Sequence, residues 1–193
     1  SLDINIITLT SAKNRINNQS NYNVKNLIDY RNLFSKDEQS KIEYYGKILI
    51  KDNHNENSVI TKQESVFYLG LSFFDLTLEN GYNKAMELYN INQRQSFFPV
   101  YSISKIIEFI SPDFLLTTNS PRFEAASILA CRNLNIPSIQ ILDLFGDDFP
   151  LPSANYIIVM GDYVANKLKN QIRNSKILAL GQPVFEKTVK SVK

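Results

Sequence analysis

Two periodic patterns of apolar and polar positions alternate in the second half of the chain. Stretches with apolar residues three or four positions apart, which are typical of helices, are separated by short apolar, β-branched runs, which are typical of buried strands. Helices and strands that alternate with short loops favour a parallel sheet. The pattern predicts helices at 100–110, 121–135 and 162–172, and strands at 113–118, 138–145, 154–161 and 176–181.

The first half of the chain is less regular. Residues 4–10 form a short apolar run that predicts a buried strand, and the apolar positions from Val24 onward predict a modest helix. Residues 41–52 predict one or two strands. The aromatic-rich stretch 63–90 predicts two buried helices separated by Asn80-Gly81, a pair that suits the end of a helix.

Together these elements predict an α/β fold: a three-layer, Rossmann-like architecture with a mostly parallel sheet and helices on both faces. No internal repeat or linker is visible, so residues 1–193 are expected to form a single domain. Right-handed crossovers bring the carboxyl ends of parallel strands to one edge of a sheet, where ligands commonly bind. That edge should carry the polar turns after Thr10, Thr118, Phe145, Met160 and Leu180.

Composition and charge narrow the classes of function. The 193 residues are 44% apolar, which suffices for a sizeable core, and a net charge of +2 does not favour a nucleic-acid partner. No apolar run is long enough to span a membrane, although peripheral contact with a membrane remains compatible with the sequence. One cysteine, Cys131, fits a reducing compartment, so we expect a cytoplasmic protein. One Cys and one His, His54, exclude a zinc cluster, and no metal site is predicted.

The polar turn before the helix predicted at 121–135 has two interpretations. Ser120 is expected at the N-cap and Pro121 at the first helical position, which explains the turn as a helix start. The positive end of the helix dipole would also favour an anionic ligand, lined by Thr118, Asn119 and Ser120 and within reach of Arg122. No glycine-rich phosphate loop occurs, which excludes a dinucleotide fingerprint or a P-loop.

Carboxylates and glycines follow the later strands. The carboxylates of Asp143, Asp147 and Asp148 can act as a general base or bind a metal through oxygen. Asp147 and Asp148 are also residues that commonly occur in turns without any further role. Asp143 is our first candidate for a catalytic base. Gly161 and Gln182 are further candidates for ligand contact, although Asp162 beside Gly161 is expected to cap a helix.

Residues 96–185 resemble the N-terminal domain of GT-B glycosyltransferases, a group that also includes the UDP-N-acetylglucosamine 2-epimerases. The likeness consists of several features in this order: a strand that follows Pro-Asp, an Ala-rich helix, a strand that follows Asn-Ile-Pro, a strand that precedes a helix, and the motif Gly-x-Pro. The matching pieces are 110-ISPDFLLTT-118, 120-SPRFEAASILACRNLNIPSIQI-141, 154-ANYIIVMGDYVANKL-168 and 177-ILALGQPVFE-186.

The resemblance implies the acceptor-binding domain of a sugar-nucleotide-dependent glycosyltransferase, in the synthesis of a surface polysaccharide. Its partner would be a sugar or glycan acceptor, with Asp143 as the base for the acceptor hydroxyl. A UDP-sugar or similar donor would bind mainly to a second, C-terminal domain that these 193 residues do not include. The resemblance thus implies a truncated N-terminal half that holds no cofactor and is inactive alone.

The chain also departs from the family. The glycine-rich turn that follows the family's first strand is replaced by residues 8–14, which lack glycine. The alternative hypothesis is therefore a non-catalytic α/β module that binds a small ligand or a partner. A third hypothesis is an interaction domain whose contact surface is the aromatic segment 66–90.

Overall fold

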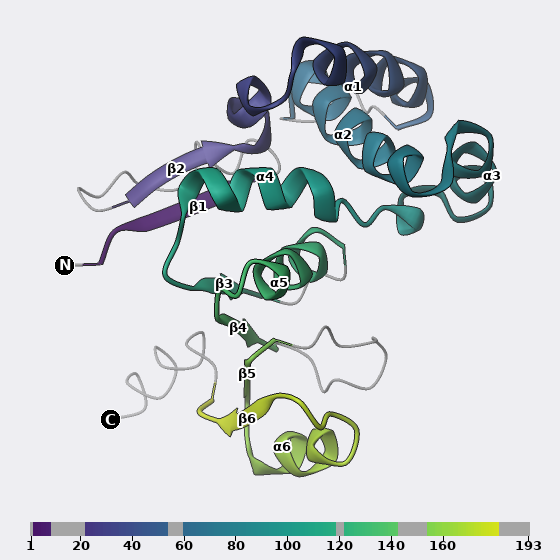
Figure 1. Cartoon of the computed structure of the whole chain (residues 1–193). Coiled ribbons are helices and arrows are strands. Elements are labelled where there is room, and N and C mark those ends of the chain that lie inside the picture. The colour runs from purple at the N-terminus through teal and green to yellow at the C-terminus, as the bar shows by residue number, and fades with distance from the viewer. Residues whose placement is uncertain (1, 9–21, 54–59, 119–121, 143–153, 182–193) are drawn as a thin grey trace. The chain divides into compact units, whose positions relative to one another are not determined.

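The chain divides into two compact units, an N-terminal unit of residues 1–110 and a C-terminal unit of residues 111–193 (Figure 1). The expectation that residues 1–193 form one Rossmann-like domain stays a prediction. The computed structural model describes residues 2–8, 22–53, 60–118, 122–142 and 154–181.

The described part of the N-terminal unit combines a two-stranded sheet with helices. Its strands are β1 (Ile4–Thr8) and β2 (Tyr22–Asn26). The two strands pair in parallel, with Ile4 opposite Tyr22 and Thr8 opposite Asn26. The helices are η2 (Leu27–Leu33), α1 (Lys36–Leu49), η3 (Ile50–Asp52), α2 (Lys62–Asn80), α3 (Tyr82–Asn92), η4 (Gln93–Ser96) and α4 (Val100–Ile110), where η marks a 3-10 helix.

The helix predicted from Val24 onward is wrong. Val24 lies in β2 and is opposite Ile6 of β1, and only the residues after Asn26 form a helix, the 3-10 helix η2. Backbone pairing with a strand far away in the sequence therefore decides the conformation of this segment, and local spacing does not report such pairing.

The strands predicted at 41–52 are also wrong, because most of this segment belongs to α1. A capping box begins that helix: the Glu38 N–H donates to Ser35 Oγ at 3.3 Å, and the Ser35 N–H donates to Glu38 Oε2 at 2.7 Å. This Ser-x-x-Glu spacing is a helix-start signal that is visible in the sequence. It outweighs the apparent strand pattern around Gly46, which is buried in the helix.

Helices α1 and α2 lie against each other (Figure 1). They meet at two glycines. A Cβ on Gly46 of α1 would overlap the backbone carbonyl of Val66 in α2. In the same way, a Cβ on Gly70 of α2 would overlap the backbone carbonyl of Ile42 in α1. The missing side chains thus allow the two backbones to touch directly.

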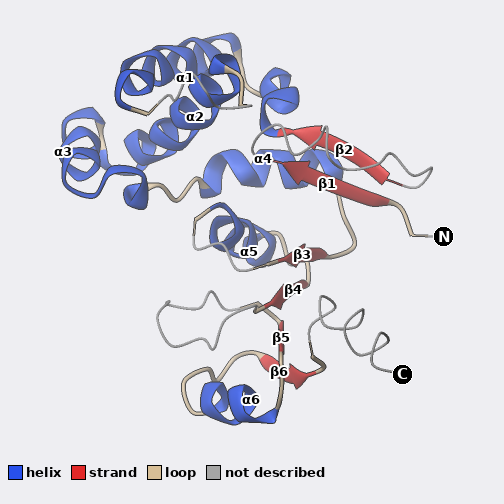
Figure 2. Cartoon of the chain, turned by 180° about the vertical axis from the view of Figure 1, so that it is seen from behind, coloured by secondary structure: helices blue, strands red, loops and turns tan. Residues whose placement is uncertain are grey.

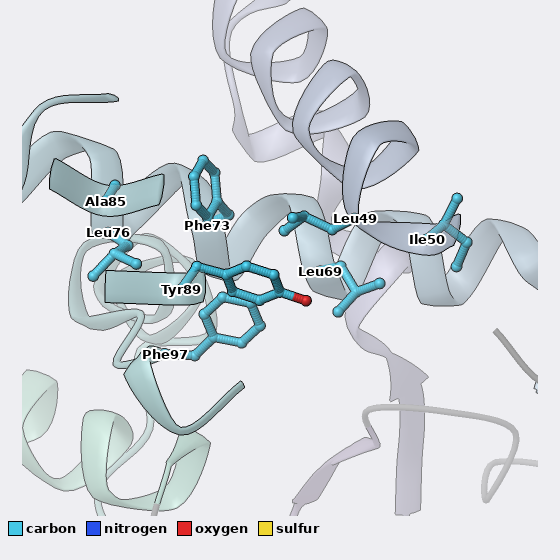
Figure 3. Close-up of a cluster of buried hydrophobic side chains, with 8 residues drawn as sticks. All are labelled: Leu49, Ile50, Leu69, Phe73, Leu76, Ala85, Tyr89 and Phe97. Atoms are coloured by element: carbon cyan, nitrogen blue, oxygen red, sulfur yellow. The ribbon is translucent and has the colours of Figure 1, made fainter. Parts of the chain in front are cut away.

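The two buried helices predicted within 63–90 are confirmed as α2 and α3, and Gly81 separates them with a left-handed φ of 72°. Their aromatic side chains form a core with the end of α1 (Figure 3). The rings of Tyr89 and Phe97 stack at 5.5 Å, and Phe73 meets the edge of Tyr89 at 6.0 Å. The core residues are Leu49, Ile50, Leu69, Phe73, Leu76, Ala85, Tyr89 and Phe97.

This burial argues against segment 66–90 as a contact surface. Phe67, Phe73, Phe74 and Tyr89 are all buried, and the half-exposed Tyr82 stacks on Tyr45 of α1. These rings stabilise the unit by removing their own surface from water, which leaves little of it for a partner.

Glu38 joins α1 to α4. Its carboxylate accepts hydrogen bonds from Lys105 Nζ at 2.8 and 2.9 Å and from the Tyr101 hydroxyl at 2.6 Å. Lys105 also lies 5.3 Å from the centre of the Phe34 ring. Burial alone would raise the pKa of Glu38, but the hydrogen bonds from Lys105, Tyr101 and Ser35 lower it to about 2.

Replacement of Glu38 by Gln is expected to lower the free energy of unfolding at pH 7 by about 2 kcal/mol. The folded pKa lies below the ordinary value of 4.5. The stabilisation is therefore complete above that value and is lost as the pH falls toward 2. Urea unfolding of both proteins between pH 2 and 7 measures the difference.

The control is Glu43→Gln, which removes an exposed ion pair with Lys47 and should change the free energy of unfolding little. An equal loss of stability in both variants would contradict the prediction.

The C-terminal unit contains a sheet of four parallel strands in the order β3-β4-β5-β6. This arrangement confirms the α/β, Rossmann-like fold and its parallel strands. Each strand and helix predicted after residue 110 is present, and each is shorter than predicted. Their bounds are β3 (Leu115–Thr117), α5 (Phe123–Asn133), β4 (Ser138–Ile141), β5 (Tyr156–Val159), α6 (Asp162–Lys169) and β6 (Lys176–Ala179).

Helices α5 and α6 lie on the same face of this sheet (Figure 2). Ile157 and Val159 point toward them from β5 and are fully buried, because alternate residues of a strand face the same side. Ile128 of α5 and Leu168 of α6 complete the same cluster. The polar ends of the strands therefore stand at the border of a well-packed core.

Candidate functional site

The carboxyl ends of β3, β4, β5 and β6 lie along one edge of the sheet, because all four strands run in parallel. The residues that follow Thr117, Val159 and Ala179 are thus at one edge, as predicted. The turns after Thr10 and Phe145 lie outside the described residues. The order of the described strands never reverses, so they form no crevice of the switch-point kind, and any site at this edge must be built by the turns and the residues beneath them.

Thr118 stands at the end of β3 and is exposed. Its hydroxyl donates to Glu124 Oε1 at 3.0 Å, and Glu124 belongs to the first turn of α5. A carboxylate thus already occupies the positive end of the helix dipole, where the sequence predicts an anionic ligand. A second anion there would be repelled by Glu124, whereas a hydroxyl group could donate to it.

The predicted start of α5 is two residues too early. Arg122 is the N-cap, with φ −107° and ψ −81°, and its carbonyl accepts from the Ala126 N–H at 2.9 Å. Phe123 is therefore the first helical residue, and the predictions of Ser120 as the N-cap and Pro121 as the first helical position are wrong. Arg122 is half-buried, and its place at the N-cap of α5 fixes its backbone position.

Gly161 begins α6 in a similar way. It is the N-cap in a fully extended conformation, and its carbonyl accepts from the Ala165 N–H at 3.1 Å. Asp162 is the first helical residue and makes no capping hydrogen bond, so the prediction that Asp162 caps the helix is wrong. Its carboxylate instead complements the dipole. A Cβ on Gly161 would meet no atom within 4 Å, so the space beside this residue is open.

Gln140 is a site residue that sequence reasoning missed. It lies in β4 opposite Thr117 of β3 and Ile157 of β5, and only 2% of its surface is exposed. Among the described residues, its carbonyl oxygen Oε1 has no hydrogen-bond partner. A buried polar atom without a partner costs about 1–3 kcal/mol, which a folded protein rarely tolerates without a reason.

A signal for Gln140 is present in the sequence. It is the single amide side chain in the apolar run 138–142, at a position that alternation directs toward the core. The neighbouring Thr117 is also buried, and its hydroxyl lies 3.4 Å from the Ile139 carbonyl. Gln140 and Thr117 therefore place two polar side chains directly beneath the end of β3.

Several predicted site residues lie outside the described residues. They are Asn119, Ser120, Asp143 and Gln182, together with Asp147 and Asp148. Of the predicted ligand contacts, the structure describes Thr118, Arg122 and Gly161.

Among the described residues, nothing supports metal or thiol chemistry. Within the described ranges, no three His, Cys, Asp or Glu side chains are close enough to hold a metal ion. Cys131 is fully buried in α5, and burial raises the pKa of its thiol to about 11, as expected of a core residue.

Neither the character of the described helices nor comparison with known proteins assigns a function. None of the helices that the structure describes has the length and apolar character needed to cross a bilayer. Comparison of the chain with models of protein families, with curated proteins and with solved structures finds no match.

Proposed function

We propose that this chain is the acceptor-binding part of a sugar-nucleotide-dependent glycosyltransferase of surface-polysaccharide synthesis. The acceptor, a sugar or glycan, would bind at the carboxyl edge of β3–β6. The observation that carries this proposal is the carbonyl oxygen of the buried Gln140, which has no hydrogen-bond partner among the described residues and lies beside Thr117, beneath the end of β3. A hydroxyl-rich ligand supplies the donors that such an acceptor atom lacks.

The charges at this edge support a neutral ligand. Glu124 is a hydrogen-bond acceptor when ionised, and Asp162 adds a second carboxylate in the first turn of α6. Sugar hydroxyl groups donate to carboxylates, whereas phosphate groups are repelled by them. The anionic ligand expected from the helix start alone is therefore replaced by a neutral polyol in this proposal.

The catalytic part of the proposal rests on the resemblance of residues 96–185 to GT-B first domains. Asp143 would accept the proton of the attacking acceptor hydroxyl while the bond between the donor sugar and its nucleotide breaks and the nucleotide leaves. A second domain, beyond these 193 residues, would hold the UDP-sugar or similar donor. Positioning of the two substrates across the domains would supply most of the rate enhancement.

A non-catalytic α/β ligand-binding or interaction module is the second candidate. It is favoured by the order of the four described strands of this sheet, which does not reverse and so gives them no switch point of the kind at which α/β enzymes commonly bind their substrates. The coding sequence beyond Lys193 separates the two. A following strand-helix array with a glycine-rich turn supports the enzyme, and an immediate stop codon would leave only the binding module.

Gln140→Met is expected to weaken sugar binding at least tenfold without loss of stability. Methionine fills a similar volume but removes the unpaired oxygen, so the free energy of unfolding should stay constant or rise by about 1 kcal/mol. Saturation-transfer NMR with N-acetylglucosamine measures binding to the whole chain, with inorganic phosphate as an anion that should not bind. Gln171→Met, at an exposed position after α6, is the matched control.

Two results would overturn the proposed site. Retained sugar binding in Gln140→Met would remove Gln140 from it, and phosphate binding that Arg122→Ala abolishes would restore the anionic interpretation of the helix start.

A further inference from the structure

The N-terminal unit contains a cavity that is separate from the edge of the β3–β6 sheet. Its volume is about 640 Å³, within the usual size of small-molecule sites, and it is lined by α1, the first turns of α2 and the 3-10 helices η2 and η3. Apolar side chains from all four segments line it: Ile28, Ile42, Ile50, Val66 and Phe67.

The apolar lining is continuous with the core of the unit. Ile42, Ile50 and Phe67 are buried, and Ile28 and Val66 are half-buried. An apolar surface of this kind gains about 25 cal/mol for every Å² that a ligand removes from water. The cavity is therefore suited to a hydrocarbon chain.

Positive charge surrounds the same cavity. Arg31, Lys47, Lys51 and Lys62 contribute to its lining, and the carboxylate of Glu43 pairs with Lys47 at 2.5 Å. Within the described ranges, no ion pair joins the other three cations to a carboxylate. Among the described residues, three positive charges at the cavity are thus without an ion pair, although the whole chain carries a net charge of only +2.

The start of α2 lies at the cavity. Lys62 and Gln63 are the first residues of that helix and line the cavity, and the carboxylate of Glu64 in the same turn offsets the positive end of the helix dipole. The capping box of Thr61 and Glu64 fixes the helix start: the Glu64 N–H donates to Thr61 Oγ1 at 3.2 Å, and the Thr61 N–H donates to Glu64 Oε2 at 2.9 Å.

From these features we propose that the cavity binds a single-chain amphiphile with an anionic head group. The hydrocarbon chain lies against Ile42, Val66 and Phe67. The head group is held by Arg31, Lys51 and Lys62, which form no ion pair with a carboxylate that the structure describes. A neutral amphiphile uses only the apolar lining, and a small anion uses only the cations, so neither binds as tightly as the molecule that combines both.

Isothermal titration of the whole chain with dodecyl phosphate, below its critical micelle concentration, tests this site. Dodecyl phosphate is expected to bind at least tenfold more tightly than dodecyl maltoside, and inorganic phosphate is expected not to bind measurably. Affinity should fall as salt is raised, because screening weakens the attraction of the exposed cations for the head group.

Paired variants locate the binding. The double variant Lys51→Gln/Lys62→Gln should lower the affinity for dodecyl phosphate at least tenfold, and its effect on dodecyl maltoside should be less than twofold. Lys36→Gln, an exposed lysine at the start of α1 that does not line the cavity, is the control and should leave both affinities unchanged. All these positions are exposed, so the variants should fold.

Three outcomes would overturn the proposal. Equal affinity for the neutral and the anionic amphiphile would show that the cations play no part. An unchanged affinity in the double variant would place the binding elsewhere. Association only above the micelle concentration, or only with phosphatidylglycerol vesicles, would indicate a membrane surface as the partner. The sugar-binding experiment on Gln140 is independent of each of these outcomes.

Discussion

Gly70→Ala is expected to lower the free energy of unfolding by about 3 kcal/mol, although alanine is the better helix former. The added methyl group would overlap the backbone carbonyl of Ile42, and backbone cannot move aside as the end of a flexible side chain can. Helices α1 and α2 would have to separate, and the core that contains Leu49 and Leu69 would loosen with them.

Urea unfolding monitored by circular dichroism measures this loss. Gly46→Ala should cost a similar amount, because its Cβ would overlap the Val66 carbonyl. Gly161→Ala is the matched control: its φ is extended and its Cβ meets nothing within 4 Å, so the same chemical change should be nearly neutral. If Gly70→Ala instead stabilised the protein by the ~1 kcal/mol of helix propensity, direct contact between the two backbones would be refuted.

The second large effect is expected at Asp75, a carboxyl that is 2% exposed in the middle of α2. It accepts hydrogen bonds from the Ser102 N–H at 3.0 Å and the Ser102 hydroxyl at 2.5 Å, and so caps the first turn of α4 from another helix. Burial raises the pKa of Asp75 to about 6, and the hydrogen bonds from Ser102 only partly offset it.

The sign of the pH dependence follows from the raised pKa. Because the folded value of about 6 lies above the ordinary value of 3.8, the folded state holds the proton more tightly than the unfolded state. The contribution of Asp75 to stability is then greatest below pH 3.8 and is lost as the pH rises through 6. The total change is on the order of 3 kcal/mol.

Asp75→Asn is expected to abolish this dependence, since the amide accepts from the Ser102 N–H and carries no charge at any pH. The difference in free energy of unfolding between wild type and Asp75→Asn should therefore change by up to about 3 kcal/mol between pH 4 and 8, in favour of the wild type at low pH. Asp75→Ala should destabilise at both ends, because two buried donors lose their acceptor.

Asp113→Asn, at an exposed aspartate, supplies the control for Asp75 and should show no such trend. A constant difference between wild type and Asp75→Asn across the pH range would mean that Asp75 titrates as an ordinary carboxyl. The hydrogen bonds from Ser102 would then fully offset the rise in the pKa of Asp75 that burial causes.

Local sequence signals predicted the elements whose packing agrees with them. Helices α2 and α3 were identified by their apolar spacing and by Asn80-Gly81, and Gly81 has the positive φ that this turn requires. The predicted bounds of α4 are those observed, and the alternation after residue 110 led to four parallel strands. In these cases the apolar residues are spaced as they are because one face of the element is buried.

The errors in the first half have two causes. Val24 is a strand residue because β1 pairs with it, and local spacing does not report such a partner. The strands predicted at 41–52 overlooked a local signal, the capping box of Ser35 and Glu38 that begins α1. At the candidate site, the sequence pointed to Thr118 and Arg122. It did not reveal that Glu124 already holds the Thr118 hydroxyl, which changes the expected ligand from an anion to a neutral polyol.

The sequence by itself determined the α/β class, the parallel arrangement of the second half and the edge at which polar turns gather, because these depend on periodicity and loop length. Only the tertiary structure decided that Asp75 caps α4, that Gln140 is buried without a described partner for its oxygen, and that three cations without a described ion pair surround one apolar cavity. Hydrogen-bond partners and burial arise from contacts between segments far apart in the sequence, and no local pattern of residues encodes them.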